Sequence, residues 1–107
     1  MAKIDDIIKE LNNISPMPDD DHLTKEVLIK YEVIIRKMAL IKDPKCIFPL
    51  INSFGYGEAN GLYWTVIHLL EEFEIEQVDP LLIESLSNGE KGTKMWAAYM
   101  LGRSRNN

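Results

Sequence analysis

The chain has one long interval without a positively charged side chain. No Lys or Arg occurs between Lys45 and Lys91, while this interval contains eight acidic residues, and the whole chain has a net charge of −5. Nucleic-acid binding depends on the neutralisation of phosphates, so this balance argues against a nucleic-acid partner. An acidic region from Glu58 to Glu90 would instead steer a positively charged protein towards it. An acidic surface that only keeps the protein soluble is the alternative explanation.

The chain also has few residues that serve as nucleophiles or metal ligands. Its single cysteine, Cys46, excludes an internal disulfide and a cysteine metal cluster. Because Cys46 lies in an apolar segment, we expect a buried structural thiol. The two histidines, His22 and His68, do not have the spacing of metal ligands, and no residue is placed to complete a catalytic triad with His68. We therefore predict a protein that is not an enzyme and that binds no cofactor or metal.

Long apolar runs are missing as well. No apolar run approaches the ~18 residues that a membrane span requires, and the first residues lack the apolar segment and cleavage site of a signal peptide. We therefore expect a cytoplasmic protein without membrane contact. No segment alternates between apolar and polar residues for long enough to indicate a strand. With 107 residues, of which 46% are hydrophobic, the chain is expected to fold as one domain.

Apolar residues instead recur at helical spacing along the chain. Asp43-Pro44 and Asp79-Pro80 each fit a helix start, with a capping Asp followed by Pro at the first helical position. The segment from Asp19 to Asp21 follows two prolines and offers a cap for the second helix. The prediction is an all-α superhelix of three antiparallel helical hairpins, with boundaries at about 3–41, 43–74 and 79–103, and with the fourth helix at about 58–74.

A repeat of 32 residues, without gaps, supports this organisation. Seven residues of the middle hairpin recur as identical residues 32 positions later: Leu50, Ile51, Ser53, Gly57, Glu58, Trp64 and Leu69. A fixed period in this range indicates stacked helical repeats. Such stacks present an extended surface to a binding partner.

The same offset relates one face of the second helix in each hairpin. The first copy of this face is Tyr31, Ile34, Ile35 and Met38; its equivalents are Tyr63, Val66, Ile67 and Leu70, then Met95, Ala98, Tyr99 and Gly102. The spacing i, i+3, i+4, i+7 places each set on one face of its helix. We therefore predict that all three sets belong to a shared core ladder.

The chain resembles HEAT-type repeat proteins, and in particular the short HEAT-like class of phycobilin lyases. The resemblance is carried by the segment from Pro80 to Leu86 together with the segment from Trp96 to Arg103, and it extends well over residues 43–104. It implies a helical solenoid, while many functions occur on such a fold. A small, acidic, helical chain of this kind is also similar in type to bacterial immunity proteins that neutralise toxins.

A second ladder, made of Glu32, Trp64 and Trp96, lies on the flank of these helices. Tryptophans beside ionisable groups are typical of interaction hot spots, and the alternative is that both tryptophans pack between hairpins. The segment from Glu71 to Glu76 adds four carboxylates at the expected end of the fourth helix, where the helix dipole disfavours them. The predicted partner-binding residues are Glu32, Tyr56, Tyr63, Trp64, His68, Glu71, Glu72, Glu74 and Trp96.

Together these patterns favour a protein-binding module that is monomeric when free. The sharpest hypothesis is an immunity protein that binds and occludes a cationic toxin domain, such as a nuclease. An adaptor HEAT-repeat protein is the first alternative. A lyase or a relative of the HEAT-like DNA glycosylases is a further one, although a glycosylase would require a basic groove that this chain lacks.

Overall fold

The computed structural model describes residues 3–105, and this part of the chain forms six α-helices and no strand. The three short 3₁₀ turns cover Asp20–His22, Pro44–Cys46 and Ala59–Gly61. The α-helices are α1 (Ile4–Ile14), α2 (Lys25–Ile41), α3 (Ile47–Ile51), α4 (Leu62–Leu70), α5 (Ile75–Asn88) and α6 (Lys91–Arg105).

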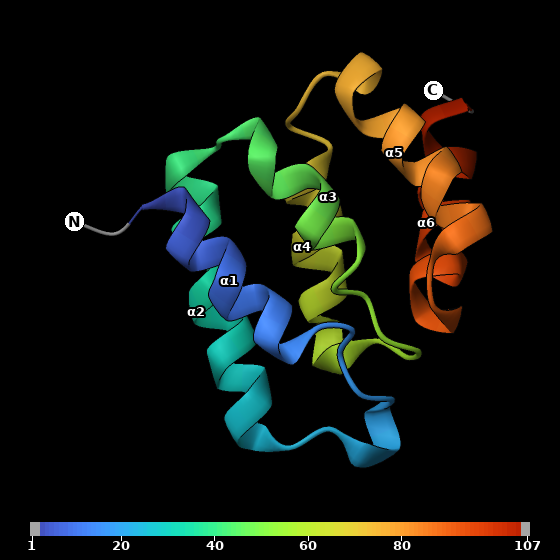
Figure 1. Cartoon of the computed structure of the whole chain (residues 1–107). Helices are drawn as coiled ribbons and strands as arrows, with labels where there is room; N and C mark the ends of the chain where they lie inside the picture. Colours follow the sequence, from blue (N-terminus) through green and yellow to red (C-terminus); the bar gives the residue numbers. More distant parts are fainter. Residues whose placement is uncertain (1–2, 106–107) are drawn as a thin grey trace.

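The six helices pack as three successive hairpins (Figure 1). α1 packs on α2, α3 on α4, and α5 on α6. The first helices of the hairpins form one layer, in which α3 contacts both α1 and α5, and α4 packs beside α2 in the other layer. The predicted all-α superhelix of three hairpins is therefore confirmed.

Of the two helix starts predicted at Asp43 and at the aspartate run, only the one at Asp43 has the predicted cap. Asp43 does cap the turn before α3, because its carboxylate accepts a hydrogen bond from the backbone N–H of Lys45. α2, however, is capped by Thr24 rather than by a residue of the aspartate run. Asp20 instead accepts hydrogen bonds from the backbone N–H groups of Glu58 and Ala59. The aspartate run therefore tethers the loop before α4 to the first hairpin.

The boundary between α4 and α5 also differs from the prediction. α4 ends at Leu70, and α5 begins at Ile75, so that Pro80 lies inside the helix rather than at its start. Pro80 has no backbone N–H to donate to the preceding turn. Val78 is buried in the core, and this packing favours the additional N-terminal turn of α5. The Asp79-Pro80 pattern was therefore a wrong indicator of a helix start.

One continuous cluster of buried apolar residues connects the three hairpins. Its centre is a series of aromatic rings from Tyr31 through Tyr63 and Phe54 to Trp96, with neighbouring ring centroids 5.4–5.9 Å apart. Most of these contacts are edge-to-face, which is a favoured geometry for aromatic pairs. The Tyr31 hydroxyl also lies 2.7 Å from Ser53 Oγ, which ties α2 to the end of α3. Cys46 is fully buried, as predicted.

The predicted core ladder is correct for α2 and α4 and wrong for α6. All four predicted residues of α2 and all four of α4 are buried. In α6 the four predicted residues, Met95, Ala98, Tyr99 and Gly102, are exposed. The helix instead buries Gly92, Thr93, Trp96, Ala97, Met100 and Leu101. The buried face of α6 is therefore rotated with respect to the repeat.

Contacts at the beginning of α6 explain this rotation. Gly92 packs so closely on Gly55 that a side chain at Gly92 would overlap the backbone of Gly55. Thr93 Oγ1 donates a hydrogen bond to the carbonyl of Phe54, and Trp96 Nε1 donates one to the carbonyl of Gly57. These three residues of α6 therefore face the loop that joins α3 to α4, and they fix the rotation of the helix.

Candidate binding cleft between α4, α5 and α6

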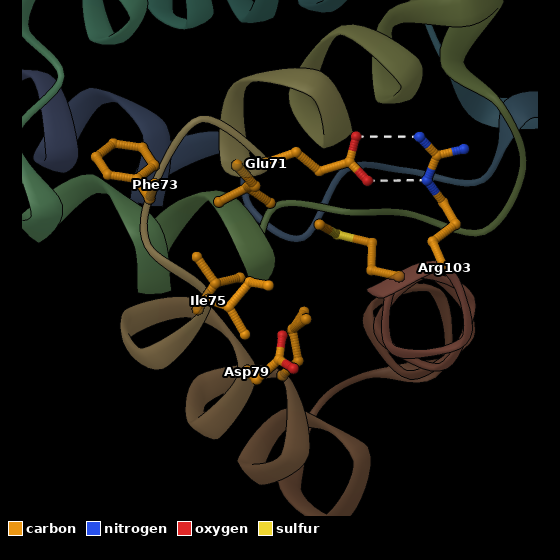
Figure 2. Close-up of a pocket in the computed structure, with 9 residues that line it drawn as sticks. Glu71, Phe73, Ile75, Asp79 and Arg103 are labelled. Atoms are coloured by element: carbon orange, nitrogen blue, oxygen red, sulfur yellow. Dashed lines mark hydrogen bonds and ion pairs between the residues drawn. The ribbon is translucent and has the colours of Figure 1, made fainter. Parts of the chain in front are cut away.

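A cleft of about 320 Å³ opens where the end of α4, the beginning of α5 and the end of α6 meet (Figure 2). This volume is at the small end of the range for ligand pockets, and it is large enough for a partner's side chain. The cleft is lined by Leu70, Glu71, Phe73, Ile75, Val78, Asp79, Leu82, Met100 and Arg103.

The wall from α5 exists because this helix begins at Ile75. Ile75, Val78, Asp79 and Leu82 are spaced as one helix face, so the additional turn places them along the same side of the cleft. Figure 2 shows Asp79 on this wall, among apolar side chains and on the side that faces α6. The cleft therefore combines aliphatic walls with a carboxylate.

A bidentate ion pair closes the other side of the cleft. Arg103 Nε and a terminal nitrogen of Arg103 donate hydrogen bonds of 2.9 and 3.0 Å to the two carboxylate oxygens of Glu71 (Figure 2). These hydrogen bonds are the main reason why the pKa of Glu71 is lowered, and the nearby charges of Arg103 and His68 lower it further. Glu71 also raises the pKa of Arg103. The pair joins α6 to the end of α4, and the opposite wall carries a second carboxylate, that of Asp79.

The structure accounts for all four carboxylates of the acidic segment that follows α4. Glu71 pairs with Arg103 of α6, and Glu72 pairs with Lys42, the C-cap residue of α2. Glu74 occupies the N-cap position of α5, and Glu76 lies in its first turn, where the helix dipole favours a negative charge. The expectation that four unfavourable carboxylates end a helix was therefore wrong.

Two of the predicted aromatic anchors are core residues. Tyr63 is fully buried, and its hydroxyl accepts a hydrogen bond from the backbone N–H of Gly55; burial raises its pKa to about 12. Trp96 is only 6% exposed and packs against Trp64, with ring centroids 5.7 Å apart. The alternative in which the tryptophans pack between hairpins is therefore correct for Trp96, and it holds in part for the half-buried Trp64.

The remaining predicted residues are divided between three places. Trp64 and the exposed His68 lie on the outer side of α4, where Trp64 also contacts the ring of Tyr99. Tyr56 is exposed in the loop before α4, with the Lys91 ammonium 4.0 Å from the centre of its ring. Glu32 forms an ion pair with Arg36 on α2 and does not line the cleft.

Sequence reasoning missed the residues that complete the cleft. The aliphatic and aromatic lining residues Phe73, Ile75 and Met100, and the polar residues Asp79 and Arg103, were not among the predicted partner-binding residues. The repeat contained one usable signal, because Glu71 and Arg103 are 32 residues apart and therefore occupy equivalent positions on α4 and α6. Opposite charges at equivalent positions of adjacent stacked helices indicate a cross-helix ion pair.

A comparison with known proteins finds no matching family model, no matching curated protein and no matching solved structure. The resemblance to HEAT-like repeats therefore stays a prediction. Among residues 3–105, no group of three or more His, Cys, Asp and Glu side chains is arranged to hold a metal ion. In the same part of the chain, no helix is both long and apolar enough to cross a membrane.

Proposed function

We propose that the protein is a non-enzymatic protein-binding module whose partner inserts a basic side chain into the cleft between α4, α5 and α6. The observation that carries this proposal is the lining of the cleft, in which Asp79 lies among Ile75, Phe73 and Met100. A lysine or arginine has an apolar stem and a charged end. Its stem would pack on the aliphatic wall while its charge pairs with Asp79.

The surroundings of the cleft support a partner with several positive charges. Glu74 and Glu76 are exposed beside it, and neither forms an ion pair within residues 3–105. The already formed pair of Glu71 and Arg103 holds one side of the cleft in place before a partner arrives. A preformed site lowers the ordering cost of binding.

A second feature beside the cleft supports a protein rather than a small molecule as the partner. Trp64 and Tyr99 lie edge to face, with ring centroids 5.4 Å apart, and both are partly accessible. Accessible aromatic rings next to charged residues are enriched in protein interfaces. In its specific form the proposal is an immunity protein, which covers the active surface of a cationic toxin domain with this side of the superhelix.

The cleft can be tested with a short lysine-containing peptide added to the isotope-labelled protein. The proposal predicts shifts of the backbone amide signals of Ile75, Asp79 and Arg103. Asp79→Asn should weaken binding about tenfold, because a charge-assisted hydrogen bond is lost. Glu84→Gln is the matched control, since it removes the same charge from an exposed position of α5 that does not line the cleft.

The proposal is wrong if the peptide shifts no signals in the cleft, or if Asp79→Asn and Glu84→Gln weaken binding equally. The immunity hypothesis requires a further measurement. A toxin domain encoded beside this gene should lose its activity when the protein is added. It should keep that activity when the Asp79→Asn protein is added at the same concentration.

A further inference from the structure

α2 carries an apolar stripe on the side opposite to its core face. Ile29, Val33 and Leu40 are 52%, 45% and 87% exposed, respectively. With about 100° per residue, these three side chains lie within a narrow arc of the helix. Tyr31, Ile34 and Met38 cover the opposite side and are buried. The stripe therefore lies on the outer side of α2, where Ile29 and Val33 also line a groove with Glu10, Asn13 and Ile14 of α1.

The repeat shows that this stripe is not an ordinary feature of the fold. The residues of the next repeat that are equivalent to Ile29, Val33 and Leu40 are Gly61, Thr65 and Glu72. All three are exposed as well. At these outward positions α4 and its flanking residues are thus small or polar, while α2 carries three large aliphatic residues. Exposed apolar groups that follow one helix face indicate an interaction surface.

Positive charges border the stripe on both sides. Lys25 and Arg36 lie on one flank, and Lys30 and Lys37 lie on the other, so α2 has more cations than carboxylates although the chain is acidic. Arg36 pairs with Glu32, and Lys37 lies 3.7 Å from Glu10 of α1. Within residues 3–105, Lys25 and Lys30 make no ion pair. A surface of this composition suits an apolar segment with negative flanks.

The beginning of α5 has the complementary composition. Ile75 is 58% exposed and lies between the exposed carboxylates of Glu74 and Glu76. α2 and α5 lie on opposite sides of the molecule (Figure 1). Within one chain, a lysine at the end of α2 already pairs with a carboxylate of the acidic segment before α5, since Lys42 forms an ion pair with Glu72.

We propose that the apolar, basic stripe of α2 binds the beginning of α5 in a second copy of this chain. The contact joins two different surfaces, so it is a head-to-tail contact, which can continue from copy to copy. This proposal does not depend on the proposed function, because it requires no other protein. It differs from the monomer that the sequence suggested.

Sedimentation velocity of the purified chain over a range of concentrations tests the proposal. Self-association should appear at low salt and weaken at high salt, because salt screens the charged flanks. The double substitution Val33→Glu/Leu40→Glu should weaken self-association at least about tenfold. Thr65→Glu is the matched control, since it places the same charge at the equivalent exposed position of α4 and should have no effect. A chain that is monomeric at every concentration overturns the proposal.

Mixing two variants tests the head-to-tail geometry. Val33→Glu/Leu40→Glu removes the α2 surface, and Glu74→Lys/Glu76→Lys removes the α5 surface; circular dichroism should show that both variants are folded. Neither should self-associate alone, but a mixture should form a dimer because each variant keeps one intact surface. Self-association of Glu74→Lys/Glu76→Lys alone would indicate a symmetric α2 contact and overturn the proposal. Binding to anionic lipid vesicles without self-association would overturn it as well.

The cleft can be examined separately from self-association. The Val33→Glu/Leu40→Glu variant leaves every lining residue of the cleft unchanged. If this variant binds the lysine peptide and does not self-associate, both proposals stand. If it self-associates normally and still binds the peptide, only the α2 proposal fails. If it is monomeric and does not bind the peptide, only the proposed function fails.

Discussion

α4 and α6 occupy equivalent positions in the 32-residue repeat, but they bury different faces. α4 buries Tyr63 and Ile67, whereas the equivalent residues of α6, Met95 and Tyr99, are exposed. Conversely, Trp96 is buried in α6, while its equivalent in α4, Trp64, is partly accessible. A repeat therefore determines that a helix is present and where it lies in the chain, and it does not determine the rotation of that helix.

The rotation of α6 is a property of one contact between segments distant in sequence. The close packing of Gly92 on Gly55 and the hydrogen bond from Trp96 to Gly57 hold the beginning of α6 on the loop before α4. The position equivalent to Gly92 is Asn60, which lies in the 3₁₀ turn before α4. Both copies carry Trp at the position of Trp96, so the Gly at position 92 is the difference that lets α6 approach this loop closely.

Substitution of the two tryptophans should give the largest difference in the free energy of unfolding between α4 and α6. Trp96→Ala should lower the free energy of unfolding by about 3–5 kcal/mol, because it removes a buried ring from the aromatic series. Trp64→Ala should cost less than half as much, since that side chain is only half-buried. Urea unfolding of the two variants measures this difference. Equal losses would show that the two helices are equivalent after all.

Substitution of the two glycines of α6 should give the next largest difference in the free energy of unfolding. Gly92→Ala should lower the free energy of unfolding by about 1–3 kcal/mol, because the new methyl group overlaps the backbone of Gly55. Gly102→Ala is the matched control on the same helix. No atom lies within 4 Å of a Cβ added there, so this change should stabilise the helix by up to about 1 kcal/mol. Thermal unfolding measures both, and a stable Gly92→Ala protein would contradict the close contact.

Loss of the ion pair between Glu71 and Arg103 should have the smallest effect on stability. The pKa of Glu71 is lowered in the folded protein, so its contribution to stability is present above the ordinary carboxyl value of 4.5 and is lost as the pH falls through the lowered value. Arg103→Gln should therefore destabilise the protein slightly at neutral pH, because the pair is partly exposed. The difference from the unchanged protein should disappear in acid. A pH-independent difference would point to lost packing of the Arg103 side chain instead.

The sequence predicted much of the fold and less of the cleft. The helical hairpins and the buried residues of α2 and α4 followed from apolar spacing, which requires only local geometry. The predicted beginning of α5 was wrong because Asp79-Pro80 has the same local pattern as Asp43-Pro44. The burial of Val78 favours a helix that begins one turn earlier, at Ile75. Because the cleft contains residues from that additional turn, its α5 wall was missed as well.

The sequence also did not predict which charged and hydroxyl groups are paired. The acidic interval was visible in the sequence, but Lys42 and Arg103 reach its carboxylates from other helices. Ser53 and Ser85 are equivalent in the repeat, and so are Tyr31 and Tyr63. Ser53 contacts the hydroxyl of Tyr31, but the hydroxyl of Tyr63 accepts a hydrogen bond from the backbone N–H of Gly55 instead of contacting Ser85. Within the described residues, Ser85 Oγ is therefore buried without a hydrogen-bond partner. Equivalent residues made different contacts because their neighbours differ.

The sequence by itself determined that this chain forms stacked helical hairpins, because helical periodicity and a gapless repeat are local properties that every copy carries. Only the tertiary structure decided which face of α6 is buried, which carboxylates are paired and where a cleft opens. These features depend on contacts between segments far apart in the chain, such as Gly92 with Gly55 and Arg103 with Glu71. The repeat thus identified equivalent positions, and packing gave them different surroundings.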